Sequence, residues 1–111
     1  MSVCFAYVVT PDRENAEQMA HSLLTDRLIA CANIIEGMTS IYRWDGEIQR
    51  DTETILIVKT RQQRLPEVEA AIKKMHPYDC PCVAAWPITA GNPEFLRWIE
   101  TETAKPRDLL A

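Results

Sequence analysis

The chain has 111 residues, of which 47% are hydrophobic, and this length suffices for one domain with its own core but not for two. We therefore expect a single domain over residues 1–111. Sixteen acidic and twelve basic residues give a net charge of −4 without long runs of one sign, which argues against a nucleic-acid partner. No basic region precedes an apolar stretch at the N-terminus, and no apolar run approaches the roughly 20 residues of a bilayer span, so we expect no membrane contact.

Residues 3–10 are a nearly continuous apolar run, which predicts a central strand buried on both faces. Pro11 suits the first position of a helix with Thr10 as its N-cap, and apolar residues then recur at helical spacing. We expect this helix to end near Leu28.

A long β-hairpin is predicted over residues 31–60, because Asp45-Gly46 readily adopts the positive φ angles of a type I′ turn. Its arms would span on the order of 45 Å, whereas a chain of about 100 residues has a radius of gyration near 13 Å, so the tip must leave the core. Counting outward from the turn predicts these strand pairs: Trp44 with Glu47, Tyr42 with Gln49, Ile34 with Ile57, and Cys31 with Thr60.

The tip of this hairpin is apolar, since Ile41, Tyr42, Trp44 and Ile48 cluster there. A projecting arm with so much aromatic and aliphatic surface needs another chain to cover it. We therefore expect an oligomer with these four residues at the subunit interface.

A second amphipathic helix is expected over residues 65–75, with Pro66 in its first turn and His76-Pro77 at its end. Residues 82–88 read as another strand, in which Pro87 indicates an edge or a bulge.

Asn92-Pro93 is typical of a helix start and predicts a short third helix before a polar tail from Thr101. The resulting β-α-β-β-α-β order indicates an α+β protein with the ferredoxin-like split βαβ fold, a long central hairpin and a C-terminal helix. Two helices cover only one face of such a sheet, so the other face is expected to meet other subunits.

The cysteines Cys4, Cys31, Cys80 and Cys82 are too few for a secreted disulfide scaffold, and the last two are too close along a strand to bridge comfortably. Free thiols in a reducing cytoplasm are therefore expected. Cys4 and Cys31 lie in apolar strands and are interpreted as inert core thiols.

A catalytic function is not expected. The chain has no glycine-rich phosphate loop after the first strand, and its two histidines, His21 and His76, do not suggest a set of nucleophile, base and orienting group. No organic cofactor is expected either.

Three sequence blocks resemble the CutA divalent-cation tolerance family: Ala30-Cys31-Ala32-Asn33-Ile34-Ile35, Ser40-Ile41-Tyr42-Arg43-Trp44-Asp45-Gly46, and His76-Pro77-Tyr78. Further similarity extends over most of the chain. The resemblance implies a cytoplasmic homotrimer of ferredoxin-like subunits, similar in assembly to the PII signalling proteins. It also implies a role in response to and tolerance of divalent metal ions, copper included, of a signalling rather than a catalytic type.

The chain departs from the family at several positions. It has Glu36 where the family usually has Pro, and Cys82 where the family usually has Glu. Members linked to copper binding carry Cys and His at the positions of Val9 and Met75. Of the positions linked to copper, only His76 carries over directly.

A metal site is a hypothesis for His76, Cys80 and Cys82, because an imidazole and two thiolates suit Cu(I) or Zn(II). The alternative is structural. In that interpretation His76 caps the second helix, and the two cysteines pack as small hydrophobic residues on opposite sides of the strand start.

A ligand cleft between subunits is a second hypothesis, in which Lys59 and Tyr78 face a small anion or a metal complex together with His76. The alternative is a solvated lysine and a packed tyrosine. A third function class also stays open, namely a structural or adaptor trimer that binds a protein partner through the rim of its hairpins.

Overall fold

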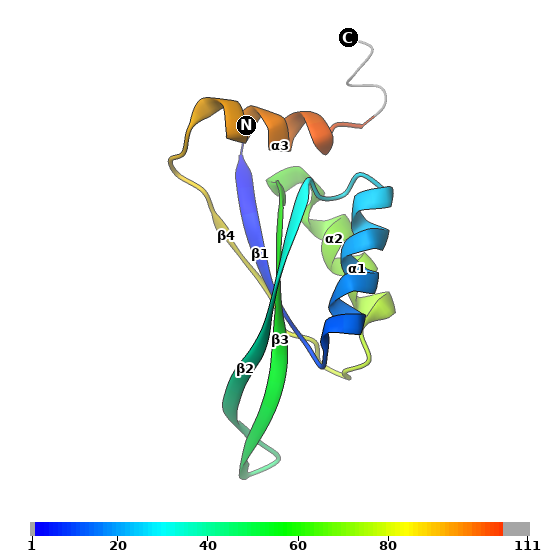
Figure 1. The fold of residues 1–111 in the computed structure, drawn as a ribbon, viewed down its shortest axis with the longest axis vertical. Helices are drawn as coiled ribbons and strands as arrows, with labels where there is room; N and C mark the ends of the chain where they lie inside the picture. Colours follow the sequence, from blue (N-terminus) through cyan, green and yellow to red (C-terminus); the bar gives the residue numbers. More distant parts are fainter. Residues whose placement is uncertain (1, 106–111) are drawn as a thin grey trace.

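A four-stranded antiparallel sheet in the order β2-β3-β1-β4 carries the fold (Figure 1). The computed structural model describes residues 2–105. In chain order the elements are β1 (Val3–Thr10), α1 (Arg13–Thr25), β2 (Cys31–Trp44), β3 (Glu47–Arg61), the 3-10 turn η1 (Gln62–Arg64), α2 (Leu65–Met75), β4 (Val83–Pro87) and α3 (Pro93–Glu102). The predicted ferredoxin-like order and the additional C-terminal helix are therefore confirmed.

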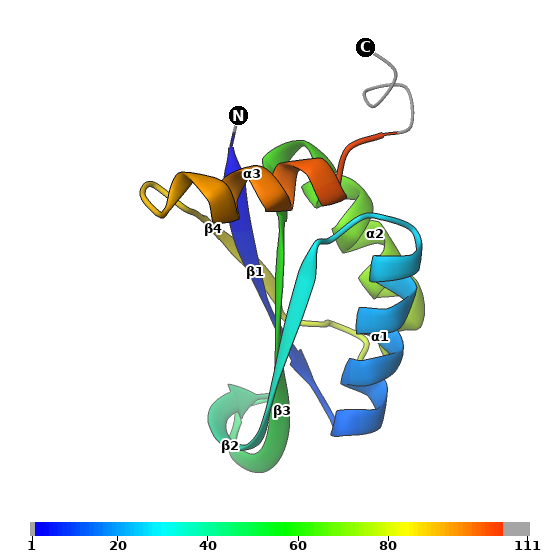
Figure 2. The same ribbon diagram turned by 45° about the horizontal axis from the view of Figure 1, so that its top comes forward.

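Strand β1 lies in the centre of the sheet, between β3 and β4, as its apolar sequence predicts. Its alternate residues Ala6 and Val8 are fully buried against α1 and α2, which lie together on one face (Figure 2). Within residues 2–105, the opposite face is covered only at the end where β1 begins, where α3 lies across the sheet and Phe5 packs against a cluster that includes the buried Ile99 of this helix. The rest of that face, which we call the open face, is not covered by any helix in the part of the chain that the structure describes.

The main core lies between the sheet and α1 with α2. Its fully buried members are aliphatic and sulfur-containing residues: Ala6, Val8, Ala16, Met19, Leu23, Ile29, Leu56, Val58, Val68 and Ile72. No helix in the described part of the chain is long and apolar enough to cross a membrane.

Helix α1 begins at Arg13, so the predicted start at Pro11 with Thr10 as N-cap is wrong. Asp12 is the N-cap, and its carboxylate accepts a hydrogen bond from the backbone N–H of Asn15 at 2.8 Å. The Thr10 hydroxyl instead lies 3.0 Å from the carbonyl oxygen of Thr54 and binds it within the sheet.

The same helix ends at Thr25, before the predicted end near Leu28, and Arg27 has a φ of 57°, which is outside the range of a right-handed helix.

Helix α3 is longer than predicted, because Thr101 and Glu102 belong to it and Thr103 is its C-cap. Its last carbonyls are held by guanidinium groups. Arg64 donates to Thr103 O at 2.8 Å, and Arg27 donates to Thr101 O at 3.1 Å. Cations at this end of a helix also complement its dipole. The predicted tail over residues 106–111 lies outside the described residues.

The hairpin turn has the predicted geometry, with φ of 52° at Asp45 and 80° at Gly46. The predicted pairs of Trp44 and of Tyr42 are confirmed, whereas the pairs nearer the core are shifted by one residue. Ile34 faces Leu56 and Cys31 faces Lys59, instead of Ile57 and Thr60.

A β-bulge causes this shift. Ile35 pairs with Ile55 and Met38 pairs with Glu53, so that Glu36 and Gly37 together oppose a single residue of β3. Gly37 has a φ of 76°, a left-handed conformation that glycine adopts at little cost. The outer half of the hairpin curls away from the axis of the inner half (Figure 2), as the stronger local twist of a bulge would produce.

The hairpin tip leaves the core, as its length predicts. The protein measures 53 × 28 × 22 Å with a radius of gyration of 15.0 Å, compared with about 13 Å for a compact chain of this size. Within one chain Ile48 is 70% exposed and Trp44 is 56% exposed. That Ile41, Tyr42, Trp44 and Ile48 are covered by another subunit stays a prediction.

Replacement of Gly37 by alanine tests the bulge. A Cβ atom at Gly37 would meet nothing within 4 Å, so only the backbone strain of its positive φ opposes the substitution. We expect Gly37→Ala to lower the free energy of unfolding by about 1–2 kcal/mol, measured by denaturant titration at one fixed chain concentration. Gly91→Ala is the control and should cost less, because no positive φ is involved. Equal losses in the two variants would contradict the assignment of strain to the bulge.

Candidate functional site

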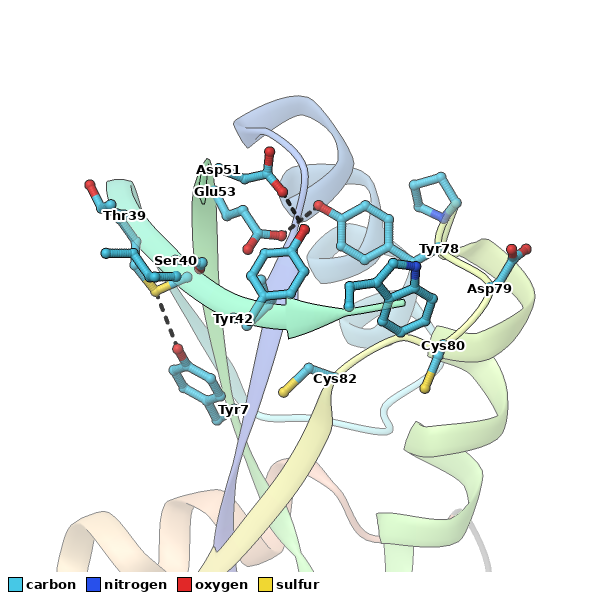
Figure 3. Close-up of a pocket in the computed structure, with 15 residues that line it drawn as sticks. Tyr7, Thr39, Ser40, Tyr42, Asp51, Glu53, Tyr78, Asp79, Cys80 and Cys82 are labelled. Atoms are coloured by element: carbon cyan, nitrogen blue, oxygen red, sulfur yellow. Dashed lines mark hydrogen bonds between the residues drawn. The ribbon is translucent and has the colours of Figure 1, made fainter. Parts of the chain in front are cut away.

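A groove with a volume of about 840 Å³ lies between the outer half of the hairpin and the loop that joins α2 to β4 (Figure 3). Three strands and this loop supply its lining: Tyr7 and Val9 from β1; Met38–Tyr42 and Trp44 from β2; Asp51 and Glu53 from β3; and Pro77–Cys80 and Cys82 from the loop. Tyr7 and Val9 alternate with the buried Ala6 and Val8, so the groove lies on the open face of the sheet.

The bulge determines which β2 side chains enter the groove. Before it, Ala32 and Ile34 pack against the helix-covered core. After it, Met38 and Tyr42 lie on the groove side, because the extra residue exchanges the two faces of the strand.

The groove is acidic. Asp51, Glu53 and Asp79 line it, and the residues described as lining it include no lysine, arginine or histidine. Carboxylates gathered in a concave surface create a negative potential, which attracts cations and repels anions.

Glu53 is the most deeply placed of these carboxylates, with only 7% of its surface exposed. The Tyr78 hydroxyl donates a hydrogen bond to Glu53 Oε2 at 2.6 Å (Figure 3). Partial burial of Tyr78, this hydrogen bond and the nearby negative charge of Glu53 all raise the pKa of the Tyr78 phenol. Tyr78 is thus held as a neutral donor toward Glu53.

A second phenol and carboxylate pair stands beside the first. The Tyr42 hydroxyl donates to Asp51 Oδ2, and this hydrogen bond is the main cause of a raised pKa at Tyr42. The two residues come from paired strands, in which Asp51 lies opposite Ser40 and therefore diagonal to Tyr42. The groove therefore presents two carboxylates that already accept hydrogen bonds from neutral phenols.

His76 is buried behind the groove, and both nitrogens of its ring are engaged. Nε2 lies 2.6 Å from the carbonyl oxygen of Val9 and donates to it, while Nδ1 accepts the backbone N–H of Tyr78 at 3.2 Å. The backbone N–H of His76 also binds Ile72 O as the C-cap of α2, so the predicted capping role is confirmed. To bind a metal, His76 would have to give up one of its ring hydrogen bonds.

Cys80 and Cys82 are free, exposed thiols, and both line the groove. The alternative that they pack as small hydrophobic residues on opposite sides of the strand start is wrong, because both side chains are exposed and both line the same groove. Burial, then the negative charge of Glu53 and the neighbouring Cys80, raise the pKa of the Cys82 thiol. Over residues 2–105 no three His, Cys, Asp or Glu side chains are close enough to hold a metal ion, so one chain does not bring His76, Cys80 and Cys82 together as a ligand set.

Lys59 lies near the end of β3 that is far from the hairpin turn and from the groove. Its ammonium group stands over the rings of Phe5 and Phe95, at 5.3 and 5.5 Å from their centroids. Along the extended strand this is roughly 20 Å from Glu53 and hence from Tyr78. The predicted cleft of Lys59 and Tyr78 therefore requires that different subunits contribute the two residues.

Glu53 was missed by the sequence analysis, although the sequence carries a signal for it. It has the same parity along β3 as Ile55 and Ile57 on one side and Asp51 on the other, so it is the carboxylate at which this face of the strand changes from apolar to acidic. A charged residue in that pattern indicates either an edge position or a site, and Figure 3 shows it within the groove.

The pair formed by Tyr78 and Glu53 predicts an alkaline loss of stability. The pKa of Tyr78 in the folded protein exceeds its ordinary value of about 10, so its contribution is complete below about pH 10 and is lost as the pH rises toward the folded-state pKa. As the pH is raised above about 10, the free energy of unfolding should fall for wild type and should fall by less for Tyr78→Phe, as followed by denaturant titration at each pH. Glu53→Gln keeps the hydroxyl of Tyr78 but removes the carboxylate charge beside it, so its loss of unfolding free energy should be intermediate between those of wild type and Tyr78→Phe. Parallel curves for all three proteins would contradict the coupling.

Comparison with known proteins gives consistent matches. The family described as "CutA1 divalent ion tolerance protein" matches residues 4–102. A divalent-cation tolerance protein CutA of Thermus thermophilus is 43% identical over 96 residues, which cover 86% of this chain and 93% of that protein. The crystal structure of CutA1 from Oryza sativa superposes with a TM-score of 0.91 at 37% identity, covering 95% of this chain and 96% of the other.

A chloroplastic CutA protein of Arabidopsis thaliana is 41% identical over 97 residues, which cover 87% of this chain. The chain spans about half of that relative's length, 53%. The match to the family covers nearly the whole described structure, from β1 to the last residue of α3. The chain therefore belongs to the CutA1 divalent ion tolerance family.

Proposed function

We propose that this protein binds copper or another divalent cation at a site that is completed between the subunits of a homotrimer. In this proposal it acts in metal tolerance by binding and signalling, without turnover. The observation that carries the proposal is the acidic groove, in which carboxylates and thiols gather and the described lining contains no basic side chain. Family membership supplies the connection to divalent cations.

The donor groups of the groove fit such a cation. Carboxylate oxygens and thiolate sulfurs are ligands of Zn(II), and soft thiolates also suit copper. Glu53 and Cys82 would supply them, since the charge of Glu53 acts on the Cys82 thiol. One chain does not assemble three such groups among its described residues, so a neighbouring subunit would complete the ligand set.

A feature of the fold supports a thiol at this place. The backbone N–H of Val9 donates to the carbonyl oxygen of Cys82 at 3.3 Å, so the two residues are neighbours across β1 and the start of β4. The resemblance described above places a cysteine at the position of Val9 in members linked to copper. Cys82, which directly precedes β4, therefore places a thiol beside the β1 position that Val9 occupies in this chain.

Assembly into a homotrimer is supported by two exposed apolar surfaces. One is the hairpin tip, and the other is the open face of the sheet, where Ile35 and Trp86 are exposed within one chain. Surfaces of this kind mark contacts with other chains. The number three comes from the resemblance to the family, and a cytoplasmic location is proposed because all four cysteines are free thiols.

The hydrogen bonds of His76 favour binding over catalysis. A general base needs a free ring nitrogen, yet Nδ1 accepts the N–H of Tyr78 and Nε2 donates to Val9 O. The other histidine, His21, lies on α1, away from the groove lining.

Calorimetric titration with Zn(II) and with Cu(II) tests cation binding. We expect wild type to bind each metal, and Glu53→Gln to weaken binding by about tenfold or more, because a ligand carboxylate becomes a neutral amide of the same shape. Glu69→Gln removes an exposed charge on α2 outside the groove and serves as the control. Unaltered binding in Glu53→Gln, or no binding by wild type, would refute the proposal.

Light scattering of a hairpin variant tests the trimer. Trp44→Glu should shift the particle mass from trimer toward monomer, because a charge would enter a desolvated contact. Leu24→Glu introduces the same charge at an exposed apolar residue of α1, away from the hairpin, and should leave the trimer intact. A wild-type particle with the mass of one chain, or a Trp44→Glu trimer as stable as wild type, would count against the assembly.

A further inference from the structure

The negative charges of the groove are spread along it and do not converge on one point. Asp51, Glu53 and Asp79 all line the groove, yet within residues 2–105 no three His, Cys, Asp or Glu side chains lie close enough to hold one metal ion. Separate negative charges match separate positive charges along one flexible molecule. We propose that the groove binds an aliphatic polyamine, whose ammonium groups pair with these carboxylates. This ligand is an organic cation and needs no metal, so the inference goes beyond the proposed function and does not depend on it.

Glu53 has one carboxylate oxygen that receives no donor from the described part of the chain. Its side chain is 93% buried, since only 7% of the residue is exposed, and its Oε2 accepts the Tyr78 hydroxyl at 2.6 Å. Oε1 accepts no hydrogen bond from any residue that the structure describes. Figure 3 shows this second oxygen on the side away from the Tyr78 hydroxyl. A charged and largely desolvated oxygen gains most from a charged N–H donor, which an ammonium group supplies.

Asp51 repeats this arrangement two residues earlier on β3. Its Oδ2 accepts the Tyr42 hydroxyl, and its Oδ1 accepts no hydrogen bond from the described residues. Residues two apart in a strand share a face and lie roughly 7 Å apart along it, a distance that a few methylene groups span. Asp79 lines the groove from the loop between α2 and β4 (Figure 3). Several ammonium groups on one chain can therefore each meet a carboxylate.

Three tyrosines supply apolar walls of fixed orientation for the methylene groups. Tyr7 donates a hydrogen bond to Met38 Sδ at 3.2 Å, while Tyr42 and Tyr78 donate to the two carboxylates of β3. Aromatic ring faces attract a nearby ammonium charge, and rings that are already held lose little freedom on binding. The groove volume of about 840 Å³ also lies within the range of roughly 300–1,000 Å³ that is usual for ligand sites.

Calorimetric titration with spermidine tests the proposal. The full chain is used in a buffer that contains EDTA, so that metal ions do not contribute. We expect wild type to bind spermidine, and to bind butylamine at least about tenfold more weakly, because one ammonium group pairs with only one carboxylate. Glu53→Gln should weaken spermidine binding by about tenfold or more. Asp51→Asn should weaken it by about threefold, because Asp51 is exposed and its charge is screened by solvent.

Glu69→Gln is the matched control, because it removes one exposed charge on α2 outside the groove lining, and it should bind spermidine as wild type does. Circular dichroism establishes that each variant is folded, and Asp51→Asn decides the test if Glu53→Gln does not fold. No binding of spermidine by wild type, equal affinities for spermidine and butylamine, or equal losses in the groove variants and Glu69→Gln would overturn the proposal.

The two proposals for the groove can fail separately. If Zn(II) and Cu(II) do not bind, but spermidine binds and the groove variants weaken it, the divalent-cation proposal fails and the polyamine proposal stands. If the metals bind and spermidine does not, the polyamine proposal alone fails.

Discussion

Backbone hydrogen bonding between β2 and β3 continues well beyond the part of the sheet that the helices cover, and the shape of the molecule depends on it. The two arms stay paired from Cys31 and Lys59 to Trp44 and Glu47, because alternate residues of each arm exchange N–H···O=C hydrogen bonds with the other arm. The ladder thus carries apolar side chains to a place where their own chain has nothing to cover them. It also supplies one wall of the groove, so the exposed apolar tip and the groove share a single cause.

The bulge at Glu36-Gly37 gives this wall its chemistry. Without the extra residue, the outer part of β2 would keep the parity of Ala32 and Ile34, and Met38 and Tyr42 would lie on the helix side of the sheet. With it, the Tyr42 side chain lies on the same face of the sheet as Asp51, and its hydroxyl donates to that carboxylate. The left-handed conformation of Gly37 thus determines which side chains of β2 stand beside the carboxylates of the groove.

The order of the elements, the turn at Asp45-Gly46 and the apolar tip could be predicted from the sequence, because each depends on a local pattern of apolar residues or on the φ preference of a dipeptide. The register near the core could not, since a bulge shifts pairing without changing the composition of either strand. The groove was likewise beyond local patterns, because Glu53 and Tyr78 meet only through the arrangement of β3 and the α2–β4 loop. For His76 the capping role was foreseen as an alternative, but the occupation of both ring nitrogens could not be, because the partner of Nε2 is Val9 in a distant strand.

The attachment of α3 has a consequence for how its sequence can change over evolution. Arg64 and Arg27 donate hydrogen bonds to main-chain carbonyl oxygens at the end of this helix, and every amino acid has such an oxygen. Substitutions in the final turn can therefore alter the outer surface while the anchorage persists. Such a helix can diverge between relatives to meet different neighbours and still close the same end of the sheet.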